Sequence, residues 1–309
     1  MVDMSVLLEK MLIFLVLMLI GWLLARKGLL DRGGTRAMSF LTINVFMCAT
    51  IIGSGLGMDR ALGLRELGWL LFVVFAMQLL GYLIAAAVVL VTPGDRERAP
   101  VFELLMSMGN SMFIALPIVQ SIYGATAAFF VALSCLPFNV LLYTYGVWRL
   151  KSGQGAGGLR LRDILSAPLC ATIVSLLLLL LRIPVPGALR GLISAMSGAT
   201  MPLSMLVIGA SLGSVSLLDA FKARRLYLAS AVRLLVIPLL TWLLLRLFVQ
   251  DSELLMTMTI VAASPSAVLV TVLSVQYGRD SVYSAEGTLQ NTALSLVTIP
   301  LLVWLLGKF

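Results

Sequence analysis

One positive charge in an otherwise apolar stretch is the strongest chemical signal in this sequence. Arg233 lies near the middle of the run 226–249, and no carboxylate stands between Asp219 and Asp251 to neutralise it. A guanidinium stays protonated in proteins, and placing it in hydrocarbon is costly. We therefore expect Arg233 to face a polar cavity or an anionic ligand rather than lipid.

Two other apolar stretches are interrupted by proline and polar residues. The Gly-Asn-Ser segment 109–111 precedes Pro117, and the Ser-Pro-Ser segment 264–266 falls near the middle of another run. Each proline removes a backbone N–H and clashes with the preceding turn, freeing polar backbone groups that lipid cannot satisfy. Such unwound backbone can line a cavity in which a half-helix N-terminus faces an anion. An ordinary proline kink is the alternative.

Further polar residues lie inside apolar runs near the C-terminus and in the middle of the chain. Glu286 and Gln290 are four residues apart, so they share one face of a helix. A buried Glu286 would be the candidate proton carrier or the counter-charge for Arg233; alternatively its carboxylate reaches the lipid headgroups. Asn139 and Asn291 either bind a solute or hydrogen-bond helices together. No cofactor is indicated.

Composition places the chain in a membrane. It is 61% hydrophobic and 12% charged, whereas soluble domains carry about 25% charged residues. Crossing a bilayer as a helix takes about 20 apolar residues. On this criterion we expect an all-α integral membrane protein with ten transmembrane helices near 5–25, 36–56, 67–91, 101–123, 125–149, 161–182, 189–213, 224–249, 252–277 and 281–306.

The charge pattern argues for membrane sorting rather than nucleic-acid binding. The formal charge is +8, but the basic residues are divided among loops. Most of them follow the odd-numbered spans, which predicts those loops to be cytoplasmic and both termini to lie outside. Histidine is absent, and no paired carboxylates or metal-ligand clusters lie within the spans, so neither an enzyme nor a metal site is expected.

A Gly-rich linker at 151–160 divides the chain into repeats at 1–150 and 161–309. Five spans is an odd number, so the second half would be inverted relative to the first. Segment 104–108 (Leu-Leu-Met-Ser-Met) reads like 254–258 (Leu-Leu-Met-Thr-Met). The fourth and ninth spans would therefore be the equivalent, broken and crossing helices.

The same alignment pairs other positions. Both interrupted spans end in Tyr-Gly, at Gly124 and Gly278, and the third and eighth spans place Gln78 opposite Arg233. These likenesses favour two inverted five-helix repeats.

Four patterns, taken in order, resemble the auxin efflux carrier family of bacterial and plant transporters. Segment 109–117 is similar to its Asn-then-Pro crossover, and 200–212 to its Pro-Leu then Gly-x-x-Leu signature. Arg233 with Pro238 resembles the basic residue and proline of its eighth span, and 264–280 resembles its ninth span. The likeness covers essentially the whole chain. The Asn-Pro-Asn crossover of plant members is absent, which weakens the case for auxin as substrate.

The resemblance implies a scaffold of helices 1, 2, 6 and 7 and a transport domain of helices 3, 4, 5, 8, 9 and 10. The transport domain would move like an elevator, and the scaffold would form a homodimer contact. Bacterial members carry organic anions such as malonate or malate. The lone guanidinium and the two helix ends favour an anion independently.

The sequence therefore predicts a secondary active or facilitative transporter of a small organic anion, either malonate-like or auxin-like, in the cell (inner) membrane. An anion channel or a non-transporting membrane sensor is the alternative. The expected substrate-binding residues are Asn110, Ser111, Pro117, Arg233, Ser264, Pro265, Ser266, Asn139 and Asn291, with Glu286 and Gln290 as speculative coupling groups.

Overall fold

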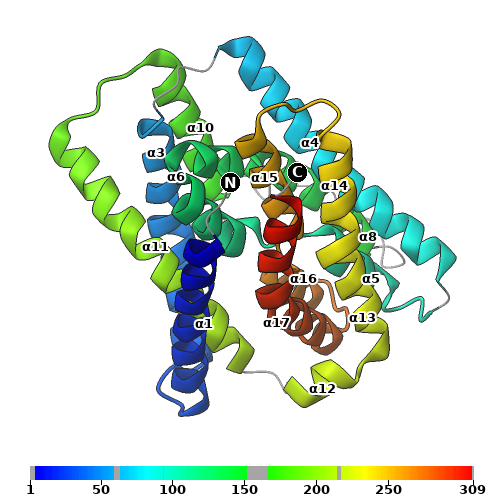
Figure 1. Cartoon of the computed structure of the whole chain (residues 1–309). Coiled ribbons are helices and arrows are strands. Elements are labelled where there is room, and N and C mark those ends of the chain that lie inside the picture. Colours follow the sequence, from blue (N-terminus) through cyan, green and yellow to red (C-terminus); the bar gives the residue numbers. More distant parts are fainter. Residues whose placement is uncertain (1–3, 59–62, 93, 152–165, 214–216, 308–309) are drawn as a thin grey trace. The chain divides into compact units, whose positions relative to one another are not determined.

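The computed structural model describes residues 4–58, 63–92, 94–151, 166–213 and 217–307 (Figure 1). Within these ranges the chain is helical, with no strand and one isolated bridge. Six helical stretches of this part are long and apolar enough to cross a membrane, and three shorter apolar helices accompany them. The predicted all-α class is therefore confirmed. The predicted Gly-rich linker lies mostly outside the described residues.

The first half of the chain forms helices interrupted by π-helical turns (η). They are α1 (Met4–Arg26), α2 (Arg32–Leu41), η1 (Thr42–Phe46), α3 (Met47–Leu56), α4 (Leu64–Val91), α5 (Ala99–Ser107), η2 (Ser111–Ala115), α6 (Leu116–Leu133), α7 (Cys135–Leu141), η3 (Leu142–Gly146) and α8 (Val147–Lys151).

The described part of the second half is also helical and has one π-helical turn. Its elements are α10 (Ala167–Leu181), α11 (Gly187–Gly213), α12 (Leu217–Lys222), α13 (Arg224–Ala231), η4 (Val232–Val236), α14 (Ile237–Leu245), α15 (Ser252–Ala263), α16 (Val268–Gln276) and α17 (Ser281–Leu306).

The chain folds into two compact units, neither of which is continuous in sequence. Unit 1 comprises 1–72, 112–136 and 165–214. Unit 2 comprises 73–111, 137–164 and 215–309. Each unit therefore combines segments from both halves of the chain.

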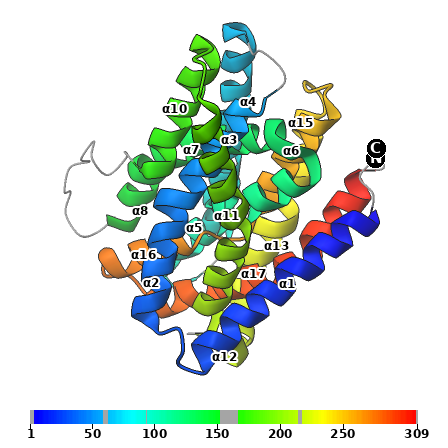
Figure 2. The ribbon, with the colours of Figure 1, turned by 90° about the vertical axis from the view of Figure 1, so that its left-hand side faces the viewer.

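In unit 1, glycines let α1 and α11 approach closely. A side chain at Gly21 would overlap the backbone of Leu206, and one at Gly209 would overlap the backbone of Met18. Figure 2 shows α1 and α11 side by side. Small residues bring helix backbones together in membranes, where packing replaces the hydrophobic driving force. The α1–α11 pair is thus specified by its glycines.

Polar contacts fasten α3 to its neighbours in the same unit. The Thr50 and Thr200 hydroxyls lie 2.7 Å apart, joining α3 to α11. Ser175 of α10 donates to the Ile51 carbonyl at 3.0 Å, directly beside Gly55. Because a side chain at Gly55 would overlap the Ser175 hydroxyl, this glycine makes the hydrogen bond possible.

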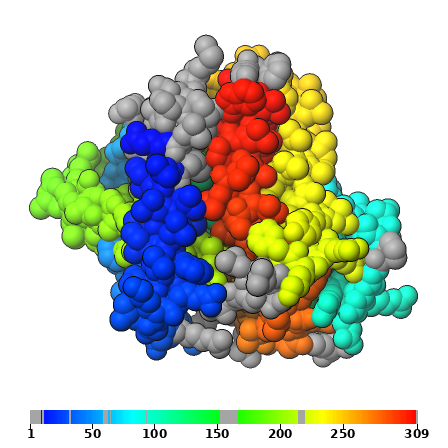
Figure 3. Space-filling view, turned by 60° about the horizontal axis from the view of Figure 1, so that its bottom comes forward, coloured from blue at the N-terminus to red at the C-terminus, as the bar shows by residue number. Residues whose placement is uncertain are grey.

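In unit 2, α17 packs along α12, α13 and α15, and Figure 3 shows α17 (red) beside the yellow surface of α13. Gly287 of α17 leaves room for Leu105 of α5 and Leu226 of α13, whose side chains would meet any Cβ added there. This packing places α5, the first half of an interrupted span, among α13, α16 and α17.

Two of the π-helical turns stand just before prolines. Pro117 follows η2 by two residues, and Pro238 follows η4 by two. A proline ring clashes with the carbonyl four residues earlier, and a wider turn relieves that clash. Pro117 therefore lies in the first turn of α6 and does not itself break the span. The break falls earlier, at 108–110, where the backbone is extended instead of helical.

Candidate functional site

The two interrupted segments satisfy each other's backbone groups. After α5, residues 108–110 run antiparallel to residues 264–267, which separate α15 from α16. The Asn110 amide donates to the Pro265 carbonyl at 2.7 Å, and the Ala267 amide donates to the Met108 carbonyl at 2.9 Å. The predicted interruptions at 109–111 and 264–266 are therefore confirmed, and both belong to unit 2.

Arg233 binds the ends of both interrupted helices. Its side chain is 4% exposed. Nε donates to the Ser264 carbonyl at 2.7 Å, and one terminal nitrogen donates to the Met106 and Ser107 carbonyls at 3.3 and 3.4 Å. The other terminal nitrogen donates to Ser264 Oγ at 3.3 Å. A single guanidinium thus caps the C-terminal ends of α5 and α15.

This capping has an electrostatic basis. The carbonyl end of a helix carries about −0.5 of a charge, so two such ends match the single positive charge of Arg233. Within the described residues Arg233 makes no ion pair with a carboxylate. The expectation that Arg233 avoids lipid is confirmed, since it lies buried against protein backbone. That it faces an anionic ligand stays a prediction.

Asn110 has an unused hydrogen-bond donor. Its side chain is 6% exposed, and Nδ2 is buried without a partner in the described structure. A buried amide donor without a partner costs about 1–3 kcal/mol. Ser111, which follows it, is also buried. A ligand acceptor at this position would remove the cost.

The α16 N-terminus adjoins the paired segments. Its N-cap residue, Ala267, provides no side-chain hydrogen bond. The first N–H groups of a helix lack intrahelical partners, and this end carries about +0.5 of a charge. Because Arg233 offsets the two carbonyl ends, the N-terminal end of α16 remains as a site that favours negative charge.

A small cavity lies beside the guanidinium. Gln78 and Arg233 both line it, together with Ser107 and Gly81, and its volume is about 10 Å³. That is room for about one water molecule. Gln78 and Arg233 are the two residues that the predicted repeat alignment pairs, and both line this cavity.

Ser264 and Ser266 are held by protein groups. Ser264 Oγ donates to the Val261 carbonyl at 2.7 Å, and Ser266 Oγ donates to the Leu105 carbonyl. Their hydroxyl protons are thus already used. The contacts given above join five of the predicted residues: Asn110, Arg233, Ser264, Pro265 and Ser266.

The remaining predicted residues are placed by other contacts. Asn291 Nδ2 donates to the Gly287 carbonyl at 3.1 Å, and Gln290 Oε1 accepts from Ser230 Oγ at 3.2 Å. Asn291 Oδ1 and Gln290 Nε2 are buried without partners in the described structure. Asn139 is buried and Glu286 is half-buried.

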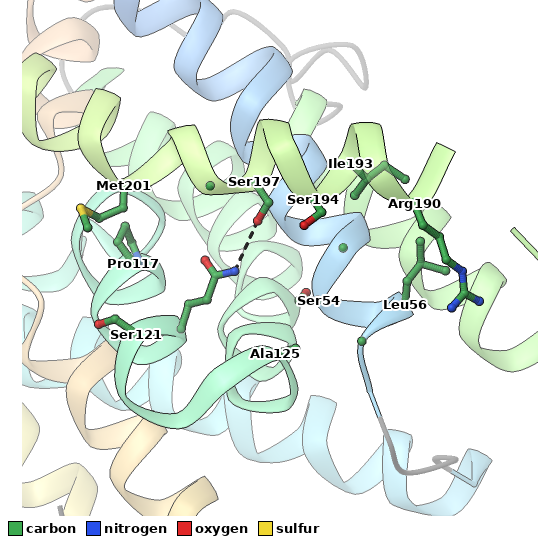
Figure 4. Close-up of a pocket in the computed structure, with 14 residues that line it drawn as sticks. Ser54, Leu56, Pro117, Ser121, Ala125, Arg190, Ile193, Ser194, Ser197 and Met201 are labelled. Atoms are coloured by element: carbon green, nitrogen blue, oxygen red, sulfur yellow. Dashed lines mark hydrogen bonds between the residues drawn. The ribbon is translucent and has the colours of Figure 1, made fainter. Parts of the chain in front are cut away.

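Pro117 belongs to unit 1, whereas the other predicted residues belong to unit 2. It lines a pocket there with Gln120 and Ser121 of the same helix and Met201 of α11 (Figure 4).

One buried ion pair was not predicted. Glu103 of α5 is 1% exposed, and its carboxylate accepts from Arg149 Nε at 2.6 Å and from the Tyr145 hydroxyl. The signal was present, since Glu103 is a carboxylate inside the predicted span 101–123. Its partner could not be found from the sequence, because Arg149 lies 46 residues away at the end of another predicted span, 125–149.

Comparison with known proteins identifies a transporter family. A family model described as "Membrane transport protein" matches residues 6–157 and 154–303. The two matched segments meet in the Gly-rich linker. An uncharacterized transporter of Methanocaldococcus jannaschii is 25% identical over 96% of this chain and 98% of its own length. One from Methanothermobacter thermautotrophicus is 26% identical over 95% of this chain and 96% of its own length. The chain therefore belongs to the membrane transport protein family of auxin efflux carrier type.

Proposed function

We propose that this membrane transporter carries a small organic anion of the malonate or malate class, bound in unit 2 beside the paired segments 108–110 and 264–267. The observation that carries the proposal is the buried Asn110 amide, whose Nδ2 has no partner in the described structure. A carboxylate oxygen would accept from this donor, and a hydrogen bond to a charged group contributes about 1.5–3 kcal/mol.

The electrostatics support an anion over a cation. The negative carbonyl ends of α5 and α15 are occupied by Arg233. What remains beside Asn110 is the positive N-terminal end of α16. We propose that Arg233 acts on the ligand mainly by neutralising those carbonyls, which would otherwise repel a carboxylate.

An elevator mechanism, two inverted five-helix repeats and a homodimer complete the proposal. The repeats are supported by the matched breaks and by positive φ angles at both Gly124 (83°) and Gly278 (61°). The scaffold is supported by unit 1, which holds 4–26, 32–56, 167–181 and 187–213. Segment 112–136 also clusters with unit 1, although the expected grouping assigns it to the transport domain. We also propose that the protein lies in the cell membrane and that both of its termini face the outside of the cell.

The test is transport by the purified protein in proteoliposomes. We expect saturable uptake of radiolabelled malonate or of another member of a carboxylate panel, with counterflow. Flux that does not saturate and shows no counterflow would favour the channel alternative. Binding of a carboxylate without flux would favour a sensor.

Asn110→Ala makes the test specific. We expect affinity to fall about 10-fold or more, since one hydrogen bond to a charged group is lost. The melting temperature should not fall, because Asn110 Nδ2 has no protein partner to lose. Asn44→Ala is the matched control, as Asn44 Nδ2 donates to the Phe40 carbonyl four residues earlier in the chain. Wild-type affinity in Asn110→Ala would refute the proposed site.

A further inference from the structure

Unit 2 contains a buried carboxylate that the proposed anion site does not use. Glu103 of α5 is paired with Arg149 of α8, and the two helices pack against each other (Figure 1). Replacing a buried ion pair by apolar residues often leaves stability unchanged or raises it. Stability alone is therefore a weak reason for the pair, and ionisable groups inside membrane proteins commonly take part in proton movement.

The pair is exposed to its surroundings through Arg149. The Arg149 side chain is 22% exposed, whereas that of Glu103 is 2% exposed. Arg149 ends the predicted span 125–149, so its exposed part lies where water is available. Tyr145, whose hydroxyl donates to the same carboxylate, is half-buried. Arg149 can therefore turn outward while Glu103 stays buried.

α5 connects Glu103 to the proposed anion site. Glu103 lies one helical turn before Met106 and Ser107, whose carbonyls bind Arg233. Ser107 Oγ also donates to the Glu103 carbonyl at 3.1 Å. The helix ends at Ser107, and Asn110 follows it closely. Because almost all of α5 is buried, a shift of Glu103 acts on a closely packed helix whose end forms the proposed site.

Polar groups continue from Glu103 toward the cavity beside Arg233. The Tyr145 ring packs edge-on against Tyr82 of α4, with ring centroids 5.5 Å apart. The Tyr82 hydroxyl is buried without a partner in the part of the chain that the structure describes. Tyr82 lies one turn after Gln78, which lines the cavity with Arg233. The two tyrosines thus connect the ion pair to the helix face that carries Gln78.

The elements in main contact with α5 carry further charged or titratable groups. These elements are α8, α13, α16, α17 and η4. Besides Arg149 they carry Lys151, Arg224, Arg225, Tyr227, Arg233, Tyr283 and Glu286. Asp280, which precedes α17, pairs with Arg98 at 2.9 Å. Glu286 is the carboxylate of these elements, and it is half-buried, whereas Glu103 is enclosed.

We propose that Glu103 binds the proton that accompanies the transported anion. In the closed arrangement Glu103 is ionised and paired with Arg149. When Arg149 turns to water, the buried carboxylate loses its counter-charge, and its neutral form is favoured in a buried site. Glu103 then takes one proton from water and releases it when the pair closes again. The inference rests on the proposed function, because it names the ion that is coupled to that transport.

The first test is malonate uptake by proteoliposomes at one external pH, so that the ionisation of external malonate stays fixed. Valinomycin and equal potassium on both sides hold the membrane potential at zero, and nigericin collapses the inward proton gradient in a parallel sample. The wild-type protein should accumulate malonate about tenfold for each unit of pH difference, since one proton accompanies each anion. Equal uptake with and without nigericin would overturn the inference.

Glu103→Gln separates coupling from transport. Glutamine keeps the size of the side chain and an acceptor for the Tyr145 hydroxyl, but it cannot take up and release a proton. The variant should keep malonate counterflow, which needs no net proton movement, and should lose the accumulation driven by the gradient. Glu97→Gln is the matched control, because Glu97 is exposed between α4 and α5, and it should accumulate malonate as the wild type does.

Two further variants keep this test decisive. If Glu103→Gln fails to fold, as judged by its melting curve, the double variant Glu103→Gln/Arg149→Met replaces it, because that variant leaves no unpaired charge. Loss of gradient-driven accumulation in Glu286→Gln, with accumulation retained in Glu103→Gln, would place the proton at Glu286 and overturn the assignment to Glu103.

Infrared spectroscopy tests proton binding without a substrate. Acidifying the purified wild-type protein should produce the carbonyl band of a buried carboxylic acid, and this band should be absent from Glu103→Gln and present in Glu97→Gln. A wild-type protein without the band would overturn the inference whether or not malonate is transported. Absence of malonate uptake and counterflow in the wild type would contradict the proposed function, whereas counterflow without gradient-driven accumulation would contradict the proton site alone.

Discussion

Gly109 lies so close to the Arg233 guanidinium that a side chain at position 109 would overlap it. The same Cβ would also overlap the Ser264 hydroxyl. The absence of a side chain at 109 lets one cation reach the carbonyls of Met106, Ser107 and Ser264. Glycine is therefore needed at position 109 because there is no room for a side chain, and not because the backbone has a positive φ.

Gly109→Ala should destabilise the protein. The added methyl forces the guanidinium away from the helix ends, and overpacking of this kind costs about 1–3 kcal/mol. The melting temperature in detergent, followed by intrinsic fluorescence, measures the effect. Gly68→Ala is the control: a Cβ there meets nothing within 4 Å, and alanine is favoured over glycine within a helix by about 0.5–1 kcal/mol. Equal melting temperatures for the two variants would contradict the role given to Gly109.

Arg233→Ala should lower both stability and anion binding. Each buried acceptor left without a partner costs about 1–3 kcal/mol, and carbonyls at the ends of both α5 and α15 lose theirs. Arg233→Lys should be intermediate, because an ammonium keeps the charge but lacks the planar fork that reaches both ends. Melting temperature and carboxylate affinity are measured on the same samples.

Comparing the loss of stability with the loss of anion binding in Arg233→Ala shows how the guanidinium acts. If Arg233→Ala loses anion binding but keeps the wild-type melting temperature, the guanidinium contacts the ligand directly. Arg246→Ala serves as the control, since Arg246 is exposed and stacks on Trp242 at 4.8 Å.

The Glu103–Arg149 pair should show strong coupling. Arg149→Met leaves the buried carboxylate without its ion partner, which costs roughly 3–5 kcal/mol. The double variant Glu103→Gln/Arg149→Met removes the uncompensated charge and should recover much of that loss. Melting temperatures of both single variants and the double variant complete the cycle. Additive losses would show that the pair contributes nothing beyond its separate members.

Gly209→Val should disrupt the contact between α1 and α11. A side chain at 209 would overlap the backbone of Met18, which cannot rotate away as a side chain can. We expect a loss of stability of about 1–3 kcal/mol or more. Gly191→Val, in open space on the same helix, should cost less. Melting temperatures of the two variants decide the point, and a smaller loss at 209 than at 191 would argue against this packing.

Local chemistry in the sequence was sufficient to find the interrupted spans. Prolines and small polar residues at 109–117 and 264–266 indicate where helices cannot continue in an apolar setting. The position of the first break was less well predicted. Pro117 was expected to contribute to it, but η2 accommodates the proline, and the extended backbone lies at 108–110.

The partners of the charged residues could not be predicted from the sequence. Arg233 was expected to face a polar cavity or an anionic ligand, and the sequence did not indicate that its donors bind carbonyls of residues 106, 107 and 264. Backbone carbonyls carry no sequence signature, so a pattern of side chains cannot reveal them as partners. Glu103 and Arg149 lie far apart in the sequence, and only folding brings them to 2.6 Å.

The sequence by itself determined the membrane setting, the helical class and the positions that cannot stay helical, because composition and proline chemistry act locally. Tertiary structure alone decided that α5 and α15 end at one guanidinium, that Asn110 keeps an unused donor and that Pro117 faces a pocket of unit 1. These features depend on which segments approach in space, and apolar helices of similar composition carry little information about their neighbours.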